Sequence, residues 1–279
     1  MDITKVERNN FRSSLLKQII IRVDYANLSD LTGFVTYIKR VESFAACFVD
    51  CRTLNLNKVD LNEPVSIADK KYFPINSMQT ETIFRFLGSK IEPIQDASLD
   101  IGLNFFCINI VCNENYDCID KYLELANLLI ITLHKYDSFV RITRIGIRKI
   151  DGDDYTSLDD AYKIFKAIRF AHDDEFKSLP RMTSKYKGEE QFKTENGVLV
   201  NLNRCVEVMG ANDFRFTLDI DTYFEKGAIN QQIAMTKDQV ERILSELLNE
   251  TSFKIFKEFV SDEFLSAGVE KYKKVYGEN

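Results

Sequence analysis

The run FVRITRIGIRKID, Phe139 to Asp151, constrains the fold most, because β-branched residues and arginines alternate along it. Successive side chains of a β-strand point to opposite faces of a sheet. By strict alternation, the apolar side of this run changes between Ile142 and Ile145. A β-bulge between residues 142 and 146 would restore one continuous apolar face, and Gly146 permits such a distortion. The run therefore predicts a bulged strand with one buried face and one polar face.

Other parts of the chain alternate between strand-like and helix-like patterns. Strands are predicted at residues 15–25, 44–51, 82–88 and 98–112, and helices at 29–41 and 116–134. Residues 53–80 are predicted to form a long loop, and residues 172–190 an irregular charged segment. These patterns predict an α+β fold, with antiparallel or mixed sheets, helices packed on one face and a long C-terminal helix.

The second half of the chain carries clear turn and capping signals. Asn196-Gly197 lies between two strand-like runs, which indicates a hairpin with a type I′ turn. S-x-x-D at Ser157 and T-x-x-Q at Thr236 are capping boxes, and Ser29 is the expected N-cap of the first helix. We place a soft boundary between an N-terminal α+β portion, 1–170, and a meander with a C-terminal helix, 171–279, packed as one unit.

Composition and charge exclude several classes of protein. The chain is 45% hydrophobic and 29% charged, which suits a folded domain with a sizeable core. Its net charge of -6 does not favour a protein that tracks nucleic acid over a wide surface. The sequence contains no G-x-x-x-x-G-K-[ST], G-x-G-x-x-G or G-x-S-x-G motif, which argues against the obvious NTPases, Rossmann enzymes and α/β-hydrolases.

Simple sequence patterns also indicate where the protein is located and whether it binds a metal. The N-terminal residues are charged and do not resemble a signal peptide, and the longest apolar run, Leu123 to Leu133, is too short to span a membrane. None of the 6 cysteines forms a CxxC pair, and His134 and His172 stand in no metal-binding motif. We expect a cytoplasmic protein without a metal, a cofactor or a disulfide.

A charged set of residues on three predicted strands is the candidate ligand site. In each strand these residues lie opposite apolar neighbours, so they can gather on one sheet face: Arg22, Asp24, Arg144, Arg148, Asp219 and Asp221. The planar fork of arginine suits phosphate or carboxylate, so such a face could bind an anionic ligand. The favoured reading, however, is a solvated face or an Arg–Asp network that fixes the register of the strands, because structural ion-pair networks look the same in sequence.

Two further charged segments carry weaker signals. Asp151, Asp153 and Asp154 resemble a calcium loop, but Gly152 comes too early, so a solvated turn is expected. Residues 185–193, KYKGEEQFK, mix basic and aromatic residues as single-strand binders do, yet two glutamates interrupt them and an exposed loop is expected.

Three segments together resemble a sporadically distributed family of uncharacterised bacterial proteins. They are LLKQIIIRVDY near the N-terminus, RIGIRKID, and LDIDTYF, Leu218 to Phe224. RIGIRKID is similar to the family motif Arg-x-Gly-Leu-Arg-Lys/Tyr-Ile-Asn, from which it departs at Ile147 and Asp151. The patchy distribution of that family implies mobile or accessory genes, such as phage-defence or toxin–antitoxin loci.

These observations favour a non-catalytic binding or interaction protein with a protein partner, as a component of a bacterial phage-defence or toxin–antitoxin system. The alternative is an enzyme or sensor that acts on a phosphorylated small molecule or nucleic acid through the Arg/Asp face. A third reading is a homo-oligomer that uses the Asn196-Gly197 hairpin or the last helix.

Overall fold

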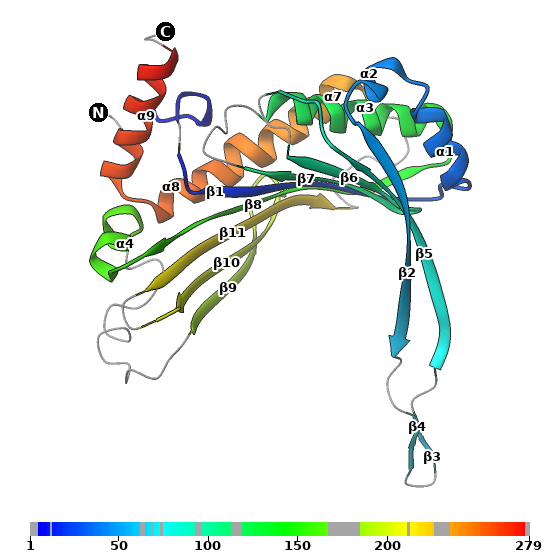
Figure 1. Ribbon diagram of the computed structural model, residues 1–279, viewed down its shortest axis with the longest axis horizontal. Helices are drawn as coiled ribbons and strands as arrows, with labels where there is room; N and C mark the ends of the chain where they lie inside the picture. Colours follow the sequence, from blue (N-terminus) through cyan, green and yellow to red (C-terminus); the bar gives the residue numbers. More distant parts are fainter. Residues whose placement is uncertain are drawn as a thin grey trace.

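The computed structural model describes residues 5–11, 13–61, 65–67, 70–72, 75–92, 96–112, 119–166, 185–210, 213–225 and 235–276. Most of the described strands join one 9-stranded sheet in which all neighbours are antiparallel (Figure 1). Their order is β2 (Asp50–Leu61), β5 (Ile75–Leu87), β6 (Ala97–Ile101), β7 (Phe105–Val111), β1 (Leu16–Ala26), β8 (Arg141–Tyr155), β11 (Phe214–Glu225), β10 (Leu199–Val208) and β9 (Lys185–Lys193). Because β8 pairs with β11, the two expected portions of the chain share one sheet.

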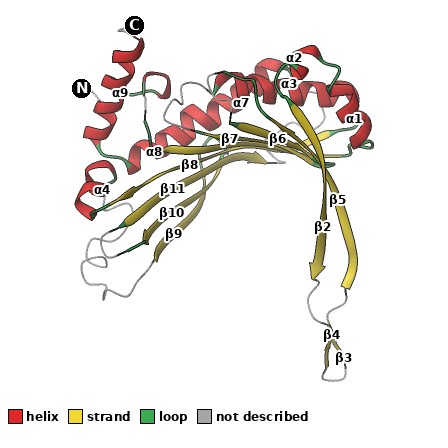
Figure 2. Cartoon of the chain, viewed as in Figure 1, coloured by secondary structure: helices red, strands yellow, loops and turns green. Residues whose placement is uncertain are grey.

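The helices pack on one face of this sheet, which we call the helix face (Figure 2). They are α1 (Leu31–Ile38), α2 (Glu42–Ala45), α3 (Asp120–Tyr136), α4 (Leu158–Ile164), α7 (Lys237–Ser245), α8 (Phe253–Phe259) and α9 (Asp262–Tyr276). In the described residues no helix lies on the opposite side of the sheet, which we call the open face (Figure 1). The expected α+β fold is confirmed.

The predicted bulge in the run Phe139 to Asp151 is confirmed. Asp24 of β1 pairs with Arg144 of β8, whereas the next residue, Tyr25, pairs with Ile142, so Thr143 is the extra residue. Ile142 and Ile145 are both buried as a result. One inserted residue changes which face each later side chain occupies, so the bulge lets β8 keep a continuous apolar face.

The hydrophobic core lies between the helix face and the helices. Alternate residues of β1, Ile19, Ile21 and Val23, are fully buried there, and their neighbours in the strand point to the open face. α3 contributes a fully buried stripe that includes Leu129 and Leu133. This packing is what α-helical and β-sheet periodicities predict when a sheet is covered on one side only.

The prediction that residues 151–155 form a solvated turn is wrong. β8 continues through them to Tyr155, and Asp151 is only 1% exposed. The cause is pairing on both sides, because Leu16 of β1 and Leu218 of β11 both stand opposite Asp151. The acidic composition of this segment therefore led to a wrong prediction for Asp151, which is buried in the sheet.

Two predictions before residue 90 are also wrong. Residues 44–51 were expected to form a strand, but α2 ends at Ala45 and β2 begins only at Asp50. Residues 53–80 were expected to form a long loop, but they contain most of β2, the small sheet β3 (Val65–Ile67) and β4 (Lys70–Tyr72), and the start of β5. Leu54 and Leu56 do alternate with asparagines, but the mixed composition of the region and its two prolines, Pro64 and Pro74, favoured a loop.

Some of the predicted turn and cap residues are confirmed, and others differ in detail. Ser157 and Thr236 cap α4 and α7 as expected, and the cap of Thr236 is reciprocal with Gln239. The first helix is capped by Asp30 and not by Ser29. Gly197 has a positive φ of 85° in the turn between β9 and β10, but Asn196 does not, so the turn is not type I′. The expected irregular segment 172–190 falls partly outside the described residues, and from Lys185 onward it is strand β9.

The C-terminal helical run is divided into parts. After α7, a π-helical segment, Glu246–Ser252, leads into α8, which ends at Phe259. Phe165 then forms an isolated bridge with Val260, after which α9 begins at Asp262. The expected apolar stripe is present, with Leu247 and Phe256 buried, and helical backbone runs from Lys237 to Phe259 with the π-helical segment in its middle, whereas α9 is a separate helix.

A buried threonine ties the π-helical segment to the sheet. Thr222 of β11 is fully buried, and its hydroxyl lies 3.1 Å from the carbonyl oxygen of Ile147 and 3.2 Å from that of Leu247. A hydroxyl in this position can donate to either carbonyl, and no apolar side chain can replace it in this role.

We expect Thr222→Val to lower the free energy of unfolding by about 1–2 kcal/mol, because buried carbonyls lose their donor while volume is nearly conserved. Urea unfolding followed by circular dichroism measures this change. Thr217→Val is the matched control, since Thr217 lies on the same strand but is only partly buried. Equal effects of the two substitutions would contradict the role assigned to Thr222.

Candidate functional site

The charged residues that the sequence singled out are brought together on the open face. β1, β8 and β11 are neighbours in the sheet, with β8 between the other two. Arg22 and Asp24 come from β1, Arg144 and Arg148 from β8, and the remaining pair, Asp219 and Asp221, from β11. The predicted gathering on one sheet face is therefore confirmed, whereas a ligand-binding role stays a prediction.

Arg144 lies at the centre of this set. Its Nη2 donates to both carboxylate oxygens of Asp221, at 3.1 and 2.9 Å, and its Nη1 lies 3.6 Å from Oδ2 of Asp24. The guanidinium also lies over the ring of Tyr223, 4.4 Å from the centroid. One arginine thus links carboxylates from the strands on both sides of its own.

Gly146 makes room for Arg144. A Cβ atom at Gly146 would lie 3.2 Å from Nη2 of Arg144 and 3.0 Å from Cβ of Tyr223. Distances this short would require a neighbour to move, so the absence of a side chain lets the guanidinium fold back along the strand. The spacing Arg144-x-Gly146-x-Arg148 therefore has a physical reason, since the three residues share the open face and the glycine separates two long side chains.

Arg148 forms the second pair between β8 and β11. Its Nε and Nη2 donate to the two oxygens of Asp219 at 2.7 and 2.6 Å, a bidentate pair. These hydrogen bonds raise the pKa of Arg148. In the strand register Arg148 stands opposite Asp221 and reaches diagonally to Asp219, whereas Arg144 stands opposite Glu225 and reaches past Gly146 to Asp221, four residues along β11. Diagonal pairs of this kind favour one strand register over its alternatives.

Arg22 is the most accessible arginine of the set. Its Nε donates to Asp24 of the same strand at 2.8 Å, and its guanidinium lies over the ring of Phe105, 4.8 Å from the centroid. The side chain of Arg22 is 46% exposed, compared with 21% for Arg144. Arg22 and Arg148, which is 45% exposed, therefore offer the most accessible guanidinium groups of the set.

The charged pairing extends beyond the predicted set. Arg85 of β5 makes a bidentate pair with Asp100 of β6, both bonds at 2.7 Å, and Arg215 pairs with Asp154 at the other end of β11. Sequence reasoning placed Arg85 and Asp100 on predicted strands but did not show that these strands are neighbours, and Asp154 was expected in a turn. Once the strands are placed, simple alternation identifies them.

Burial changes the ionisation of Asp221. Loss of water raises the pKa of this carboxyl above its ordinary value, and the charge of Arg144 is the strongest influence in the opposite direction. The side-chain hydrogen bond from Asn201 and the charge of Arg148 also lower this pKa, though less. Asp221 therefore binds its proton more tightly than a solvent-exposed aspartate does.

The arginines of this face are already engaged by carboxylates. Each arginine of the set already has a carboxylate partner, so an incoming phosphate would have to compete with an aspartate. Cys107 is the nearby thiol, and burial raises its pKa to about 11, which makes it a poor nucleophile near neutral pH. Within the described ranges, no group of three or more His, Cys, Asp or Glu side chains is arranged to hold a metal ion.

A second set of buried ionisable groups lies on the helix face. Lys149 is 5% exposed, and its ammonium lies 5.3 Å from the ring centroid of Phe256 and 6.0 Å from that of Phe253. Burial lowers the pKa of Lys149 and raises that of the neighbouring Asp151. Strict alternation placed Lys149 on the same face of the strand as Ile145 and Ile147, but the sequence did not show that α8 would cover this side chain.

No family model matches the chain, and no curated protein or solved structure shows significant similarity to it. The family resemblance therefore depends on the three segments that carry it. Among the residues that the structure describes, no helix is long and apolar enough to cross a membrane.

We expect Arg144→Met to raise the pKa of Asp221 further, and Arg148→Met to raise it less, because the charge of Arg144 acts more strongly on that carboxyl. Carboxyl-carbon NMR titration of aspartate-labelled protein measures both shifts, with Asp221→Asn to assign the signal. Equal shifts in the two variants would show that Arg144 is not the main charge partner.

The raised pKa of Asp221 also predicts a pH dependence of stability. A carboxyl that binds its proton more tightly in the folded state adds stability below its unfolded pKa, and this stability is lost as pH rises through the folded pKa. Wild-type protein should therefore lose stability relative to Asp221→Asn as pH rises from the ordinary aspartate pKa through the raised one. Urea unfolding of both proteins across that pH range measures the difference, and a rise in the stability of wild type relative to Asp221→Asn would contradict the prediction.

Proposed function

We propose that this protein is a non-catalytic binding protein that holds a protein partner against the open face and against the hairpin of β2 and β5, which we call the arm. The family resemblance leads us to place it in a bacterial phage-defence or toxin–antitoxin system, in the cytoplasm. The observation that carries the proposal is the arm, because most of its length has no other strand beside it in the described residues.

The arm extends away from the rest of the sheet (Figure 1). β2 and β5 pair with each other from Asp50 and Leu87 to Leu61 and Ile75, but β5 pairs with β6 only over Phe84–Phe86. Eight residues of β2, Leu54–Leu61, therefore lie beyond that junction, a length of about 26 Å at the usual rise per residue. Isolated two-stranded hairpins are marginally stable in water, so a partner that packs on the arm would supply stability that the arm lacks.

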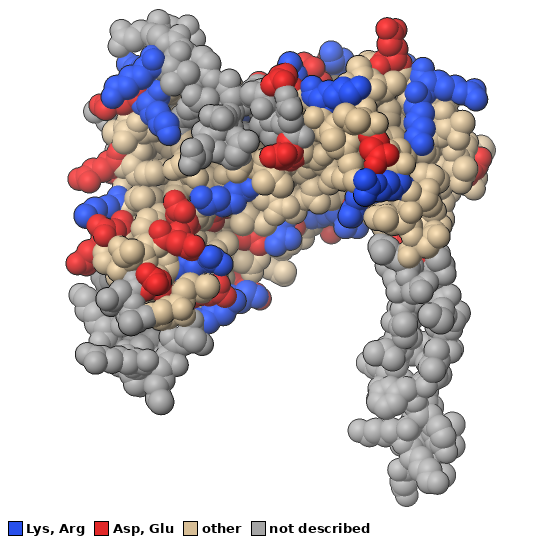
Figure 3. Space-filling view, in the orientation of Figure 1, with Lys and Arg blue, Asp and Glu red and all other residues tan. Residues whose placement is uncertain are grey.

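The open face supports a protein partner more than a phosphate ligand. Its arginines and aspartates are paired, so the face offers both signs of charge in alternation and not a single cationic site. The side of the molecule seen in Figure 3 shows the same mixture, with Lys and Arg interspersed among Asp and Glu. A partner of mixed polarity can form hydrogen bonds with such a face and use the partly exposed rings of Tyr223 and Phe105 as apolar contacts.

The alternative, an enzyme or sensor for a phosphorylated small molecule or nucleic acid, is supported by the exposure of Arg22 and Arg148, 46% and 45%. It would require at least one of them to exchange its aspartate for a phosphate. The overall charge of -6 further disfavours a nucleic acid. We therefore retain this alternative as an outcome to be tested and not as the main proposal.

We expect removal of the arm to abolish partner binding without unfolding the protein. Asn55 and Thr82 are paired across the arm, so a two-residue Asn-Gly turn can join them in place of the intervening residues. Affinity purification of tagged protein from its native cells, with quantitative mass spectrometry, should recover a stoichiometric partner with wild type and not with this variant. Light scattering on the purified chain distinguishes a foreign partner from a second copy.

A charge reversal tests the open face separately. Arg22→Glu should weaken capture of that partner by about tenfold or more, as expected when an interfacial charge contact becomes repulsive. Arg242→Glu on the exposed side of α7 is the matched control and should leave capture unchanged. Equal recovery by all variants would contradict the proposal. Stabilisation by nucleotides in a thermal-shift assay that is lost in Arg148→Ala would favour the alternative.

A further inference from the structure

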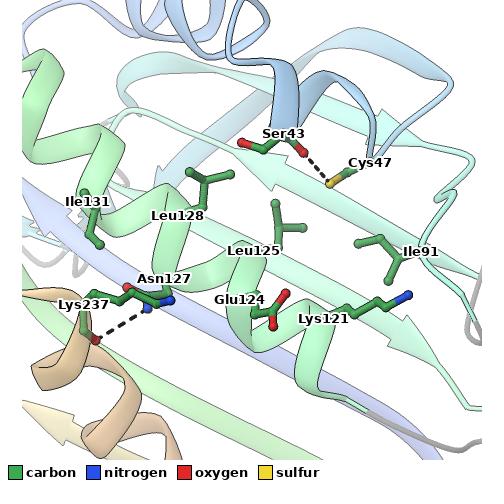
Figure 4. A pocket seen from close by; sticks show the side chains of 10 residues that line it. All are labelled: Ser43, Cys47, Ile91, Lys121, Glu124, Leu125, Asn127, Leu128, Ile131 and Lys237. Atoms are coloured by element: carbon green, nitrogen blue, oxygen red, sulfur yellow. Dashed lines mark hydrogen bonds between the residues drawn. The ribbon is translucent and has the colours of Figure 1, made fainter.

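A cavity of about 540 Å³ lies beside α3 on the helix side of the molecule (Figure 4). Apolar and charged side chains line it together, among them Leu125, Leu128, Lys121 and Glu124. Asn127 also lines it, but its oxygen Oδ1, which has no donor among the described residues, is enclosed by protein and does not face the cavity. The cavity therefore does not specify a ligand.

The outer edge of β9, by contrast, is regular and has a definite chemical pattern. β9 is the last strand of the sheet, and among the described residues only β10 pairs with it (Figure 1). Its register with β10 has no shift, whereas β2 at the opposite edge has an irregularity between Lys58 and Asp60. Bulges and prolines commonly protect sheet edges against further strands, and β9 contains neither. Its main chain can therefore accept another strand.

Alternate residues of β9 direct their main-chain groups outward. In an antiparallel pair, every second residue exchanges both of its hydrogen bonds with the partner strand, and the residues between them point the other way. The backbone N–H of Thr194 donates to the carbonyl oxygen of Val198 at 2.8 Å, so Thr194 and the even-numbered residues before it face β10. The outward N–H and C=O groups therefore belong to the odd-numbered residues: Lys185, Lys187, Glu189, Gln191 and Lys193.

The charges of these outward residues are complementary to the same strand in antiparallel orientation. With Gly188 opposite Gly188 of a second copy, Lys187 stands opposite Glu189 twice and Lys185 stands opposite Gln191. Opposite charges directly across an antiparallel pair stabilise it, and like charges destabilise it. Lys187 already forms an ion pair with Glu189 of its own strand. A second copy would add the same contact across the edge.

Neighbouring registers are less favourable. Moving the centre by one residue places either Glu189 or Lys187 opposite itself. Moving it to Glu190 brings Lys187 against Lys193. Moving it to Gln191 avoids like charges, but it leaves only residues 189–193 of β9 paired. The charge sequence of β9 therefore favours one register, the one centred on Gly188.

Gly188 suits the centre of this register. Two antiparallel strands approach most closely at a pair without mutual hydrogen bonds, where the Cα atoms are about 4.5 Å apart. Gly188 adds no side chain at this point. A Cβ atom there would lie 2.5 Å from Nε of Arg204, which fills the space and is paired with Glu190 at 2.6 Å. The two-fold axis would therefore pass through a position where neither copy adds a side chain of β9.

We propose that β9 pairs with β9 of a second copy of this chain in antiparallel orientation, centred on Gly188, so that the two sheets become one. A two-fold axis perpendicular to the sheet keeps both open faces on the same side of the dimer. The interface contains neither the arm nor Arg22. This proposal and the proposed function can therefore each fail while the other stands.

Sedimentation equilibrium of the full chain over a concentration series tests the proposal. Wild type should show a monomer–dimer equilibrium. Lys187→Glu and Glu189→Lys should each weaken the dimer by about tenfold or more, because each turns both opposite-charge contacts into like-charge contacts. An equimolar mixture of the two variants should associate about as tightly as wild type, since each lysine of one chain then faces a glutamate of the other. Lys193→Glu, outside the paired residues, is the matched control and should dimerise as wild type does.

A proline tests the main-chain contacts. Gln191→Pro removes an outward N–H and leaves the hydrogen bonds between β9 and β10 in place, so it should abolish the dimer. Gln191→Ala keeps this N–H and should dimerise as wild type does. Circular dichroism and thermal melting show whether each variant is folded, and the charge variants decide the question if the proline variant is not.

Three results would overturn the proposal: a wild type that stays monomeric at every concentration, a dimer that both charge variants retain, or a mixture of these variants that does not associate. A stronger dimer in Lys193→Glu would also overturn it, since the strands would then pair in another register. The variant with the shortened arm should dimerise as wild type does. If it is monomeric, the second copy is held by the arm and not by β9.

Discussion

Side-chain alternation along β8 is the constraint on which the rest of the structure depends. β8 pairs with β1 on one side and β11 on the other, so a change of face within it would affect the three strands together. The extra residue at Thr143 keeps Ile142, Ile145 and Ile147 under the helices. The same adjustment directs Arg144 and Arg148 to the open face, so the core and the charged network arise from one local irregularity.

Hydrophobic periodicity made the centre of the fold predictable. β1, β8 and α3 were recognisable from sequence because each must present apolar residues to one side at a fixed period. The single strand predicted at 98–112 is instead the hairpin of β6 and β7. Most of the arm was missed because the mixed composition and two prolines of residues 53–80 favoured a loop, although residues 82–88 were predicted as a strand. Asp151 was misplaced because its burial depends on β1 and β11, which are distant in sequence and leave no local signal.

Features of the candidate site also differ in how far the sequence predicted them. Alternation was sufficient to predict that Arg144, Arg148, Asp219 and Asp221 share a face, because strand geometry determines side-chain direction. Which arginine pairs with which aspartate depends on the register between β8 and β11, and that required the structure. The cavity beside α3 was not predictable, since it is formed where α2, α3 and α7 meet and Asn127 lies within an ordinary amphipathic stripe.

The position of β1 has a consequence for how the chain reaches this structure. β1 is the first strand in the sequence, yet its two neighbours in the sheet are β7 and β8, which are synthesised much later. A ribosome must therefore release more than half of the chain before the apolar strand Leu16–Ala26 can be enclosed. Contacts so distant in sequence slow folding and leave apolar surface exposed in the meantime, so we expect this protein to fold after synthesis and to benefit from chaperones.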